Sequence, residues 1–188
     1  MHTLISMLRG INVSGQKTIR MADLKAIYES LGYTQVTTYV QSGNVVFDCA
    51  NQDGSAIGSS IVKAIALRFG FSVGVIVRHS DDFGRIIASN PFITHRNEDP
   101  QRLHVTFLSA MPSAVASNYL KESIDTTDEY FLSGTEVYLF CPNGYGKTKL
   151  STSFFEKKLQ TLATTRSWKT ATALSNIANS RKILPANQ

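Results

Sequence analysis

The sequence is poor in cysteine and has no long apolar run. Its 188 residues include only Cys49 and Cys141, too few for the disulfide framework of a small secreted domain or for a cysteine-based zinc site. No stretch approaches the roughly 18 apolar residues that a membrane-spanning helix needs. The first residues also lack the basic flank, apolar run and cleavage site of a signal peptide. We therefore expect a cytoplasmic protein with reduced cysteines and no membrane association.

Charged side chains are also scarce, at 18% of the residues, but they are unevenly distributed along the chain. The net charge is +5, and the segment from Val137 to Gln188 holds eight basic residues against one acidic residue, Glu156. The segment from Glu98 to Glu136 holds seven acidic residues. A basic surface attracts phosphate groups whatever molecule carries them. The charge pattern therefore favours nucleic acid or a phosphate-bearing small molecule as the partner.

The spacing of the histidines gives no support for a metal site. His2, His79, His95 and His104 are dispersed, and the sequence contains no HxH, HExxH or CxxC pattern. Ser42 lies in QSGN rather than in the GxSxG motif of serine hydrolases, and a serine before glycine is typical of a turn. We therefore expect no metal and no cofactor, and the sequence names no catalytic residue. An enzyme whose catalytic residues come from distant loops stays open as an alternative.

The first half of the chain predicts the element order β-α-β-β-α-β. The apolar segment His2–Arg9 suits a central strand, and a helical stripe runs from Met21 to Leu31 before Gly32. The remaining predicted elements are a hairpin of Gln35–Gln41 and Val45–Cys49 around Ser42, Gly43 and Asn44, a helix carrying Ile57, Ile61, Ile65 and Phe69, and a strand at Ser72–Arg78.

The second half predicts a related order that ends differently. The predicted elements are a connecting helix at Asp81–Ala88, a strand at Leu103–Leu108, a helix from Pro112 to about Glu122, and a hairpin of Glu129–Ser133 and Glu136–Cys141. Helical stripes follow at Leu150, Phe154, Leu159 and Leu162, and then at Trp168, Leu174 and Ile177. The expected order is therefore β-α-β-β-α-α, with a helix where the first half has its last strand.

Together the two orders predict an α+β protein. The order β-α-β-β-α-β is that of the ferredoxin-like fold, in which an antiparallel sheet carries two helices on one face. We expect two ferredoxin-like repeats with mainly antiparallel sheets, at residues 1–90 and 91–188, the second ending in two helices. Because no linker rich in glycine, serine or proline separates them, we expect the repeats to pack as one compact unit.

Several short motifs occur in an order that points to a known family. They are LRGINVSGQK, MADL, LGY, VTTYVQSGNVVF, FGF with VIVR, NPF, LHVTFLS, VYLF, GYGKTKL and TTRSWKT. Together they resemble the bacterial family of unknown function DUF 1697, from Leu8 to about Leu174. The resemblance implies a cytosolic α+β protein with two ferredoxin-like repeats and no established activity. The sequence departs from the family pattern at Ser14 and Ser167, which replace a glycine and an asparagine, and at Lys147–Thr148, where serine often precedes lysine.

Two glycine loops carry the candidate site. GINVSGQKT, at Gly10–Thr18, is one residue away from the GxxxxGK[ST] phosphate-binding loop, and GYGKT, at Gly144–Thr148, lacks the first glycine of that motif. A true P-loop follows a strand of a parallel sheet and needs an acidic partner for Mg²⁺, which this fold does not offer. The loops can still donate backbone N–H groups to a phosphate or carboxylate. The candidate anion-binding residues are Arg9, Gly10, Asn12, Gly15, Lys17, Gly146, Lys147, Lys149, Arg166 and Trp168.

Three functions fit these observations. The first is a non-catalytic module that binds nucleic acid, a nucleotide or phosphate through the basic glycine loops, which predicts salt-sensitive binding. The second is an enzyme acting on a small phosphorylated or carboxylated substrate held between the loops. The third is an interaction or self-assembly module, for which a homodimer is one form. We predict that the two loops converge on one anion-accepting surface. That surface would combine Arg9, Lys17, Lys147 and Arg166, while Trp168 fits a core anchor better than a ligand contact.

Overall fold

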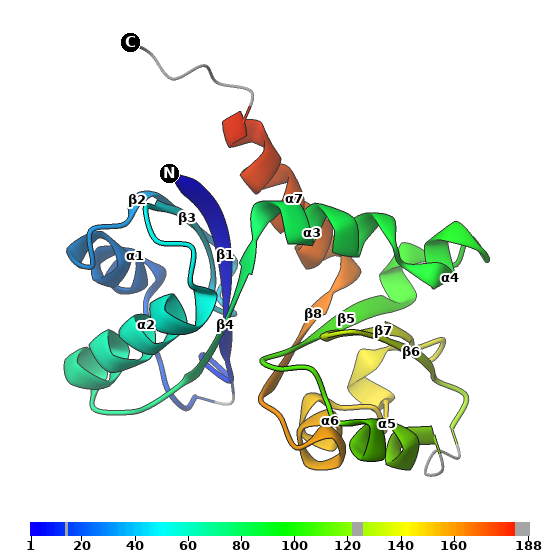
Figure 1. The fold of residues 1–188 in the computed structure, drawn as a ribbon. Helices are drawn as coiled ribbons and strands as arrows, with labels where there is room; N and C mark the ends of the chain where they lie inside the picture. The colour runs from blue at the N-terminus through cyan, green and yellow to red at the C-terminus, as the bar shows by residue number, and fades with distance from the viewer. Residues whose placement is uncertain (14, 122–125, 183–188) are drawn as a thin grey trace. The chain divides into compact units, whose positions relative to one another are not determined.

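The structure, a computed structural model, describes residues 1–13, 15–121 and 126–182 (Figure 1). The chain divides into two compact units: unit 1 consists of Met1–Arg85 and Ala173–Gln188, and unit 2 of Ile86–Thr172. The chain passes from unit 1 to unit 2 within α3 (Ser80–Ala88) and returns within α7 (Trp168–Lys182). The sequence placed the division at residue 90 and assigned the chain end to the second repeat. That the two halves pack as one compact body stays a prediction.

Unit 1 has the predicted β-α-β-β-α-β order. Its elements are β1 (His2–Arg9), α1 (Met21–Ser30), β2 (Thr34–Tyr39), β3 (Asn44–Cys49), α2 (Gly54–Phe69) and β4 (Gly74–His79). The strand order is β2-β3-β1-β4, and every neighbouring pair is antiparallel. Helices α1 and α2 cover one face of this sheet (Figure 1). The prediction of a ferredoxin-like first repeat is confirmed.

Local sequence signals set the ends of α2. The carboxylate of Asp53 accepts hydrogen bonds from the backbone N–H groups of Ser55 (2.9 Å) and Ala56 (3.1 Å), so it satisfies donors that the first helical turn leaves unpaired. At the other end Gly70 adopts a left-handed conformation, with φ 76°, and its N–H donates to the carbonyl of Ala66. Gly70 therefore terminates the helix in the way that glycine often does.

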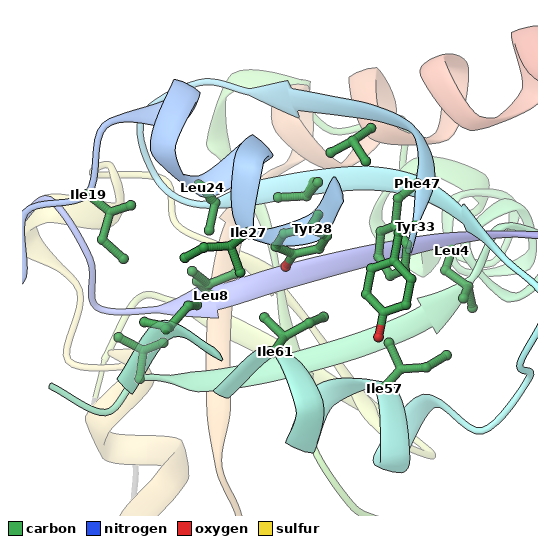
Figure 2. Packing of buried hydrophobic residues seen from close by; sticks show 14 of the residues in the cluster. Leu4, Leu8, Ile19, Leu24, Ile27, Tyr28, Tyr33, Phe47, Ile57 and Ile61 are labelled. Atoms are coloured by element: carbon green, nitrogen blue, oxygen red, sulfur yellow. The ribbon is translucent and has the colours of Figure 1, made fainter. Parts of the chain in front are cut away.

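The core of unit 1 lies between the sheet and these two helices (Figure 2). Leu8 and Phe47 point into it from neighbouring strands and are fully buried. The ring of Phe47 contacts Tyr28 edge-on at 5.1 Å and stacks on Tyr33 at 4.8 Å between centroids. The hydroxyl of Tyr28 is satisfied by a 2.7 Å hydrogen bond with the Ser6 hydroxyl, and burial raises the pKa of Tyr28 far above its usual range. The phenol therefore stays neutral inside the core.

The opposite face of the same sheet is buried as well. Ile5, Met7, Val46 and Ile76 are at most 2% exposed, and none of them belongs to the core cluster beneath α1 and α2. Successive side chains of a strand point to opposite faces, so these residues form the second face. RNA-recognition modules bind bases on an exposed sheet face of this topology. Unit 1 has no such exposed face at these residues.

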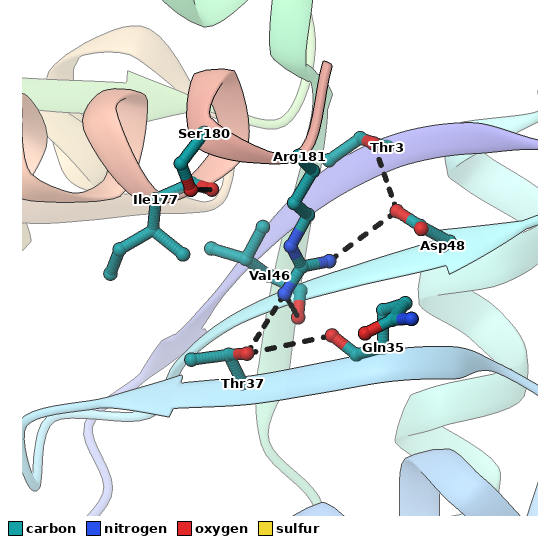
Figure 3. A network of polar contacts seen from close by, with 8 residues as sticks. All are labelled: Thr3, Gln35, Thr37, Val46, Asp48, Ile177, Ser180 and Arg181. Carbon is teal, nitrogen blue, oxygen red and sulfur yellow. Dashed lines mark hydrogen bonds and ion pairs between the residues drawn. The ribbon is translucent and has the colours of Figure 1, made fainter. Parts of the chain in front are cut away.

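Arg181 fixes the end of α7 to this second face (Figure 3). Its guanidinium donates hydrogen bonds to the Asp48 carboxylate (3.3 Å), the Thr37 hydroxyl (2.9 Å) and the Val46 carbonyl (3.1 Å). The hydroxyl of Thr3 also donates to Asp48, at 2.8 Å. These contacts explain why the end of the last helix belongs to unit 1, although it follows the second repeat in the sequence.

Unit 2 repeats the architecture of unit 1. Its elements are α4 (Pro91–Thr94), the 3₁₀ helix η1 (Pro100–Arg102), β5 (Leu103–Leu108), α5 (Ala114–Lys121), β6 (Glu129–Ser133), β7 (Glu136–Phe140), the 3₁₀ helix η2 (Tyr145–Lys147), α6 (Thr152–Leu159) and β8 (Ala163–Ser167). The strand order is β6-β7-β5-β8, again with antiparallel neighbours. The second sheet therefore has the same strand order as the first.

Strand β8 corrects the prediction that unit 2 ends in two successive helices. A helical stripe through Leu159 and Leu162 was expected, but α6 ends at Leu159 because Gln160 adopts a left-handed conformation with φ 52°. Strand β8 then pairs with β5, with Arg166 opposite Val105. The segment ATTRS lacks alternation of apolar and polar residues, so its strand signal is limited to the two β-branched residues Thr164 and Thr165.

Both faces of the second sheet are also buried. Helices α5 and α6 cover one face, where Leu139 and Phe155 are fully buried. On the other face Val105, Phe107 and Tyr138 are at most 2% exposed. These aromatic side chains are therefore core residues and do not form a stacking platform for bases.

Candidate anion-binding loops

The first glycine loop, residues 10–20, is closed by the side chain of Asn12. The amide nitrogen of Asn12 donates to the carbonyl oxygens of Ile19 (2.9 Å) and Gln41 (2.8 Å), and the amide oxygen accepts from the N–H of Ile19 (2.9 Å). Asn12 has a φ of 55°, a conformation that asparagine tolerates better than most residues. Both amide hydrogens are engaged, so Asn12 holds the loop together and has no donor left for a ligand.

The basic side chains of this loop are engaged within unit 1. The ammonium group of Lys17 donates to the carbonyl of Ser72 (2.8 Å), and Arg20 forms an ion pair with Asp23 (2.7 Å). Arg9 is the last residue of β1, which is antiparallel to both of its neighbouring strands. A P-loop requires a parallel sheet, so this loop is not a nucleotide-hydrolysing P-loop.

Gly10 and Gly15 shape the first loop through their backbone conformation. Their φ values are 69° and 73°, in the left-handed region, and a Cβ at either position would meet no atom within 4 Å. The turn at Gly15 is closed by the N–H of Gln16, which donates to the carbonyl of Val13 at 3.1 Å. Glycine is therefore favoured here by backbone geometry rather than by a close approach to other atoms. The family departure at Ser14 lies outside the described residues.

The second glycine loop, residues 141–150, is a compact turn with internal hydrogen bonds. The N–H of Gly144 donates to the carbonyl of Cys141 (2.9 Å), and the N–H of Lys147 donates to the carbonyl of Gly144 (3.1 Å). Gly144 has a φ of 86°. Gly146, Lys147 and Lys149 are exposed. The loop therefore presents two ammonium groups on a backbone that is already ordered.

Asp128, which precedes β6, fixes the end of this loop. The hydroxyl of Thr148 donates to the carboxylate of Asp128 (2.6 Å) and accepts from the N–H of Leu150 (2.9 Å). The side-chain amide of Asn143 donates to the hydroxyl of Thr127 at 3.1 Å. Two side-chain contacts thus anchor the loop to the segment before β6.

Cys141 begins the second loop, but its thiol is not a nucleophile. Its side chain is fully buried. The pKa of the Cys141 thiol is raised to about 11, mainly by burial and to a smaller extent by the charge of Asp128, while a hydrogen bond with Thr148 acts in the opposite direction. The thiol is therefore protonated at neutral pH, whereas nucleophilic cysteines react as thiolates.

A stack of Tyr145 on His104 connects the loop to the sheet. The ring centroids are 4.5 Å apart and the ring planes differ by 24°. The hydroxyl of Tyr145 lies 3.3 Å from that of Thr152, and the chain of hydroxyls continues through Thr165 to Thr106 with distances of 2.8 Å. The Nδ1 atom of His104 is buried and has no hydrogen-bond partner. The second loop therefore rests on a polar layer that joins it to α6, β8 and β5.

We expect unit 2 to lose stability on acidification because of His104. Burial lowers the pKa of His104, and a hydrogen bond with the backbone of Arg102 opposes this shift. In the unfolded chain histidine takes up a proton near pH 6.5, so the stabilisation is complete above that pH and is lost as the pH falls toward the lower pKa of the folded state. Urea midpoints measured from about pH 7.5 to 5 should fall more steeply for the wild type than for His104→Gln. Parallel pH profiles would contradict this assignment.

Arg166 and Trp168 belong to unit 2 and are buried rather than exposed on a loop. Arg166 belongs to strand β8, in a segment where the sequence predicted helices and no strand. It is 7% exposed, and its guanidinium donates to the Thr164 hydroxyl (2.7 Å) and to the Thr165 carbonyl (2.9 Å). Trp168, the first residue of α7, is 8% exposed. Both side chains are therefore buried and are not presented to solvent by a loop.

The structure groups the candidate residues by unit. Unit 1 carries Arg9, Gly10, Asn12, Gly15 and Lys17, and unit 2 carries Gly146, Lys147, Lys149, Arg166 and Trp168. Sequence reasoning missed that Asp128 and His104 support the second loop. Strand alternation could have placed His104 on the same face as Leu108. Asp128 carried no such signal, because 20 residues separate it from Thr148. That the two loops converge stays a prediction.

Comparison with known proteins identifies the family of this chain. Residues 1–138 match the family described as "Protein of unknown function (DUF1697)". The chain belongs to the DUF1697 family. The structure of the conserved bacterial protein SP0830 from Streptococcus pneumoniae is similar to this DUF1697 protein, with a TM-score of 0.73 and 20% identity over 94% of this chain and 98% of that chain. This similarity shows a shared fold. No functionally curated protein matches the sequence.

Ser167 replaces the asparagine of the DUF1697 pattern without loss of a helix cap. It precedes α7, and its hydroxyl accepts a hydrogen bond from the backbone N–H of Thr170 at 3.3 Å. Serine and asparagine are both favoured at this position because each side chain can accept from the first helical turn. This difference therefore leaves the start of α7 intact.

The described part of this DUF1697 protein contains neither a cluster of metal-binding side chains nor a membrane-spanning helix. Among residues 1–13, 15–121 and 126–182, no three His, Cys, Asp or Glu side chains come together as a metal site requires. None of the described helices combines the length and apolar composition needed to cross a bilayer.

Proposed function

We propose that this DUF1697 protein is a non-catalytic cytosolic module that binds phosphate-bearing anions, either nucleic acid or a nucleotide, through the second glycine loop. The observation that carries the proposal is the exposure of Lys147 and Lys149 on a loop held by the hydrogen bond between Thr148 and Asp128. An ordered loop loses little conformational entropy on binding. The exposed Gly146 lets a phosphate approach the backbone closely.

The interior groups near the loop support binding rather than catalysis. The thiol of Cys141 is buried and protonated, so it does not supply the thiolate that a catalytic cysteine needs. Arg166 and Trp168 are buried, so the proposal does not include their side chains. Both cysteines are free thiols, as expected for a protein of the reducing cytosol.

The mode of binding in this proposal is contact with phosphate rather than with bases. The aromatic side chains of the inner strands, Phe47, Phe107 and Tyr138, are buried, and Phe131 of the edge strand β6 is exposed singly, so these sheets offer no row of exposed aromatic rings on which bases could stack. Ammonium groups on an exposed loop bind phosphates without reading sequence, and such binding weakens with salt. Lys17 adds a second contact if the first loop lies on the same surface, although it also donates to the Ser72 carbonyl.

We expect the double variant Lys147→Ala with Lys149→Ala to bind phosphate-bearing ligands about thirtyfold more weakly than the wild type. Each charged contact at a wet surface contributes about 1 kcal/mol, and two such losses correspond to that ratio. The measurement is fluorescence anisotropy with labelled single-stranded and duplex oligonucleotides, alongside calorimetry with ATP and inorganic phosphate. Binding only to the oligonucleotides would identify a polymeric ligand, and binding of ATP would identify a nucleotide.

The matched control is the double variant Lys25→Ala with Lys63→Ala, which removes the same charge from exposed helical positions of unit 1. It should bind nearly as well as the wild type. If both double variants lose the same affinity, net charge alone explains the binding. The proposal also fails if the wild type binds none of these ligands at low salt.

A further inference from the structure

A groove runs along the outer side of unit 1 between α1 and α2. It has a volume of about 480 Å³. Its lining combines small side chains, Ala26 and Ser30 from α1 and Ala64 from α2, with the larger side chains of Asp23, Ile27, Leu67 and Arg68. Such short side chains leave room for a bulky side chain from outside. The groove is therefore open to a protruding residue of a partner.

Leu67 lines the same groove, and its side chain is exposed to solvent. It is 91% exposed, more than any other exposed large apolar side chain among the described residues. It lies in the last turn and a half of the 16-residue helix α2, where neighbouring residues are ordered by the core. An isolated exposed leucine needs no explanation, but here the exposed side chain adjoins a cavity of matching chemistry. One surface therefore offers both a protrusion and a recess.

The groove also carries one acidic and one basic side chain, Asp23 on α1 and Arg68 on α2. Asp23 is already paired with Arg20 at 2.7 Å, but the Arg20 side chain is 82% exposed, so that pair is screened and contributes little. A surface with one charge of each sign is complementary to a copy of itself. In a two-fold arrangement residue i of one copy meets residue j of the other, and j meets i.

We propose that this face binds a second copy of the chain, with each Leu67 inserted into the groove of the other copy and each Arg68 paired with the other copy's Asp23. The apolar contact supplies the affinity, and the charge pairs set the orientation. A partner with a groove but no protruding residue, or with charges of one sign, would use only half of this surface. The inference concerns α1 and α2 alone and is independent of the anion-binding proposal.

The test is the mass of the full chain in solution, measured by sedimentation velocity from low micromolar to millimolar concentration. The wild type should rise with concentration from 20.7 kDa toward twice that mass. Leu67→Glu should shift the transition to concentrations about tenfold higher or more, because it places a carboxylate in the apolar contact. The exposed Val115 of α5 supplies a matched control, since Val115→Glu should leave the wild-type transition unchanged.

Charge reversal tests the orientation separately from the apolar contact. Arg68→Glu should weaken association, and the double variant Asp23→Arg with Arg68→Glu should recover part of it by exchanging the two charges. A wild type that stays at 20.7 kDa throughout, or a Leu67→Glu variant with the wild-type transition, would overturn the proposal. A mass that continues to rise beyond the dimer would also overturn it, because a two-fold contact closes.

Discussion

Gly43→Ala is expected to destabilise unit 1 by about 2–4 kcal/mol. Gly43 lies in the turn between β2 and β3 with a φ of 75°, which strains any residue that has a Cβ. A Cβ there would lie 2.8 Å from the Cβ of Leu8 and 2.7 Å from Cδ1 of Ile11. The Cβ of Leu8 cannot rotate away, because it is bonded directly to the backbone of the inner strand β1. The expected loss combines about 1 kcal/mol of backbone strain with about 1–3 kcal/mol of overpacking.

The second hairpin supplies the matched control for this prediction. Gly134 has a φ of 60°, but a Cβ on Gly134 would meet no atom within 4 Å. Gly134→Ala should therefore cost only the backbone contribution, about 1 kcal/mol. Urea unfolding of the two variants and the wild type, followed by circular dichroism, gives the comparison. Equal losses at both glycines would show that the close approach to Leu8 has no energetic weight.

Arg181→Met is expected to destabilise unit 1 by about 2–3 kcal/mol. The substitution removes the cation that pairs with Asp48 and three hydrogen bonds, while the carboxylate stays 18% exposed. Leaving a fully buried charge unpaired costs about 3–5 kcal/mol, and the partial exposure of this pair lowers the expected cost. Of the hydrogen bonds that Asp48 accepts in this network, the one from the Thr3 hydroxyl would remain in the variant.

Asp48→Asn distinguishes the ion pair from simple packing. If the charge of Asp48 is the cause, the double variant Arg181→Met with Asp48→Asn should lose clearly less than the sum of the two single losses. Lys169→Met, at an exposed position of the same helix, should change the free energy of unfolding by no more than about 0.5 kcal/mol. Additive effects of the two substitutions at Arg181 and Asp48 would refute the role of the pair.

The glycine loops were correctly located by sequence, but their internal contacts were not. Their positions followed from strands ending at Arg9 and Phe140 and from helices starting at Met21 and Thr152. The amide of Asn12 is used by Ile19 and Gln41, partners that no local pattern relates to it. The same holds for the contact of Thr148 with Asp128. Such contacts depend on chain segments brought together by folding.

The sequence by itself determined the element order of unit 1, the α+β class and the family resemblance. Hydrophobic periodicity acts over a few positions, so the helix that carries Ile57, Ile61 and Ile65 could be predicted without a fold. Strand β8 and the burial of Arg166 were decided only by the tertiary structure. The polar segment of β8 becomes a strand because β5 offers it an unpaired edge, and Arg166 can be buried because neighbouring threonine groups accept its hydrogen bonds. Those partners exist only once the sheet has formed, since pairing energy comes from residues far apart in the chain.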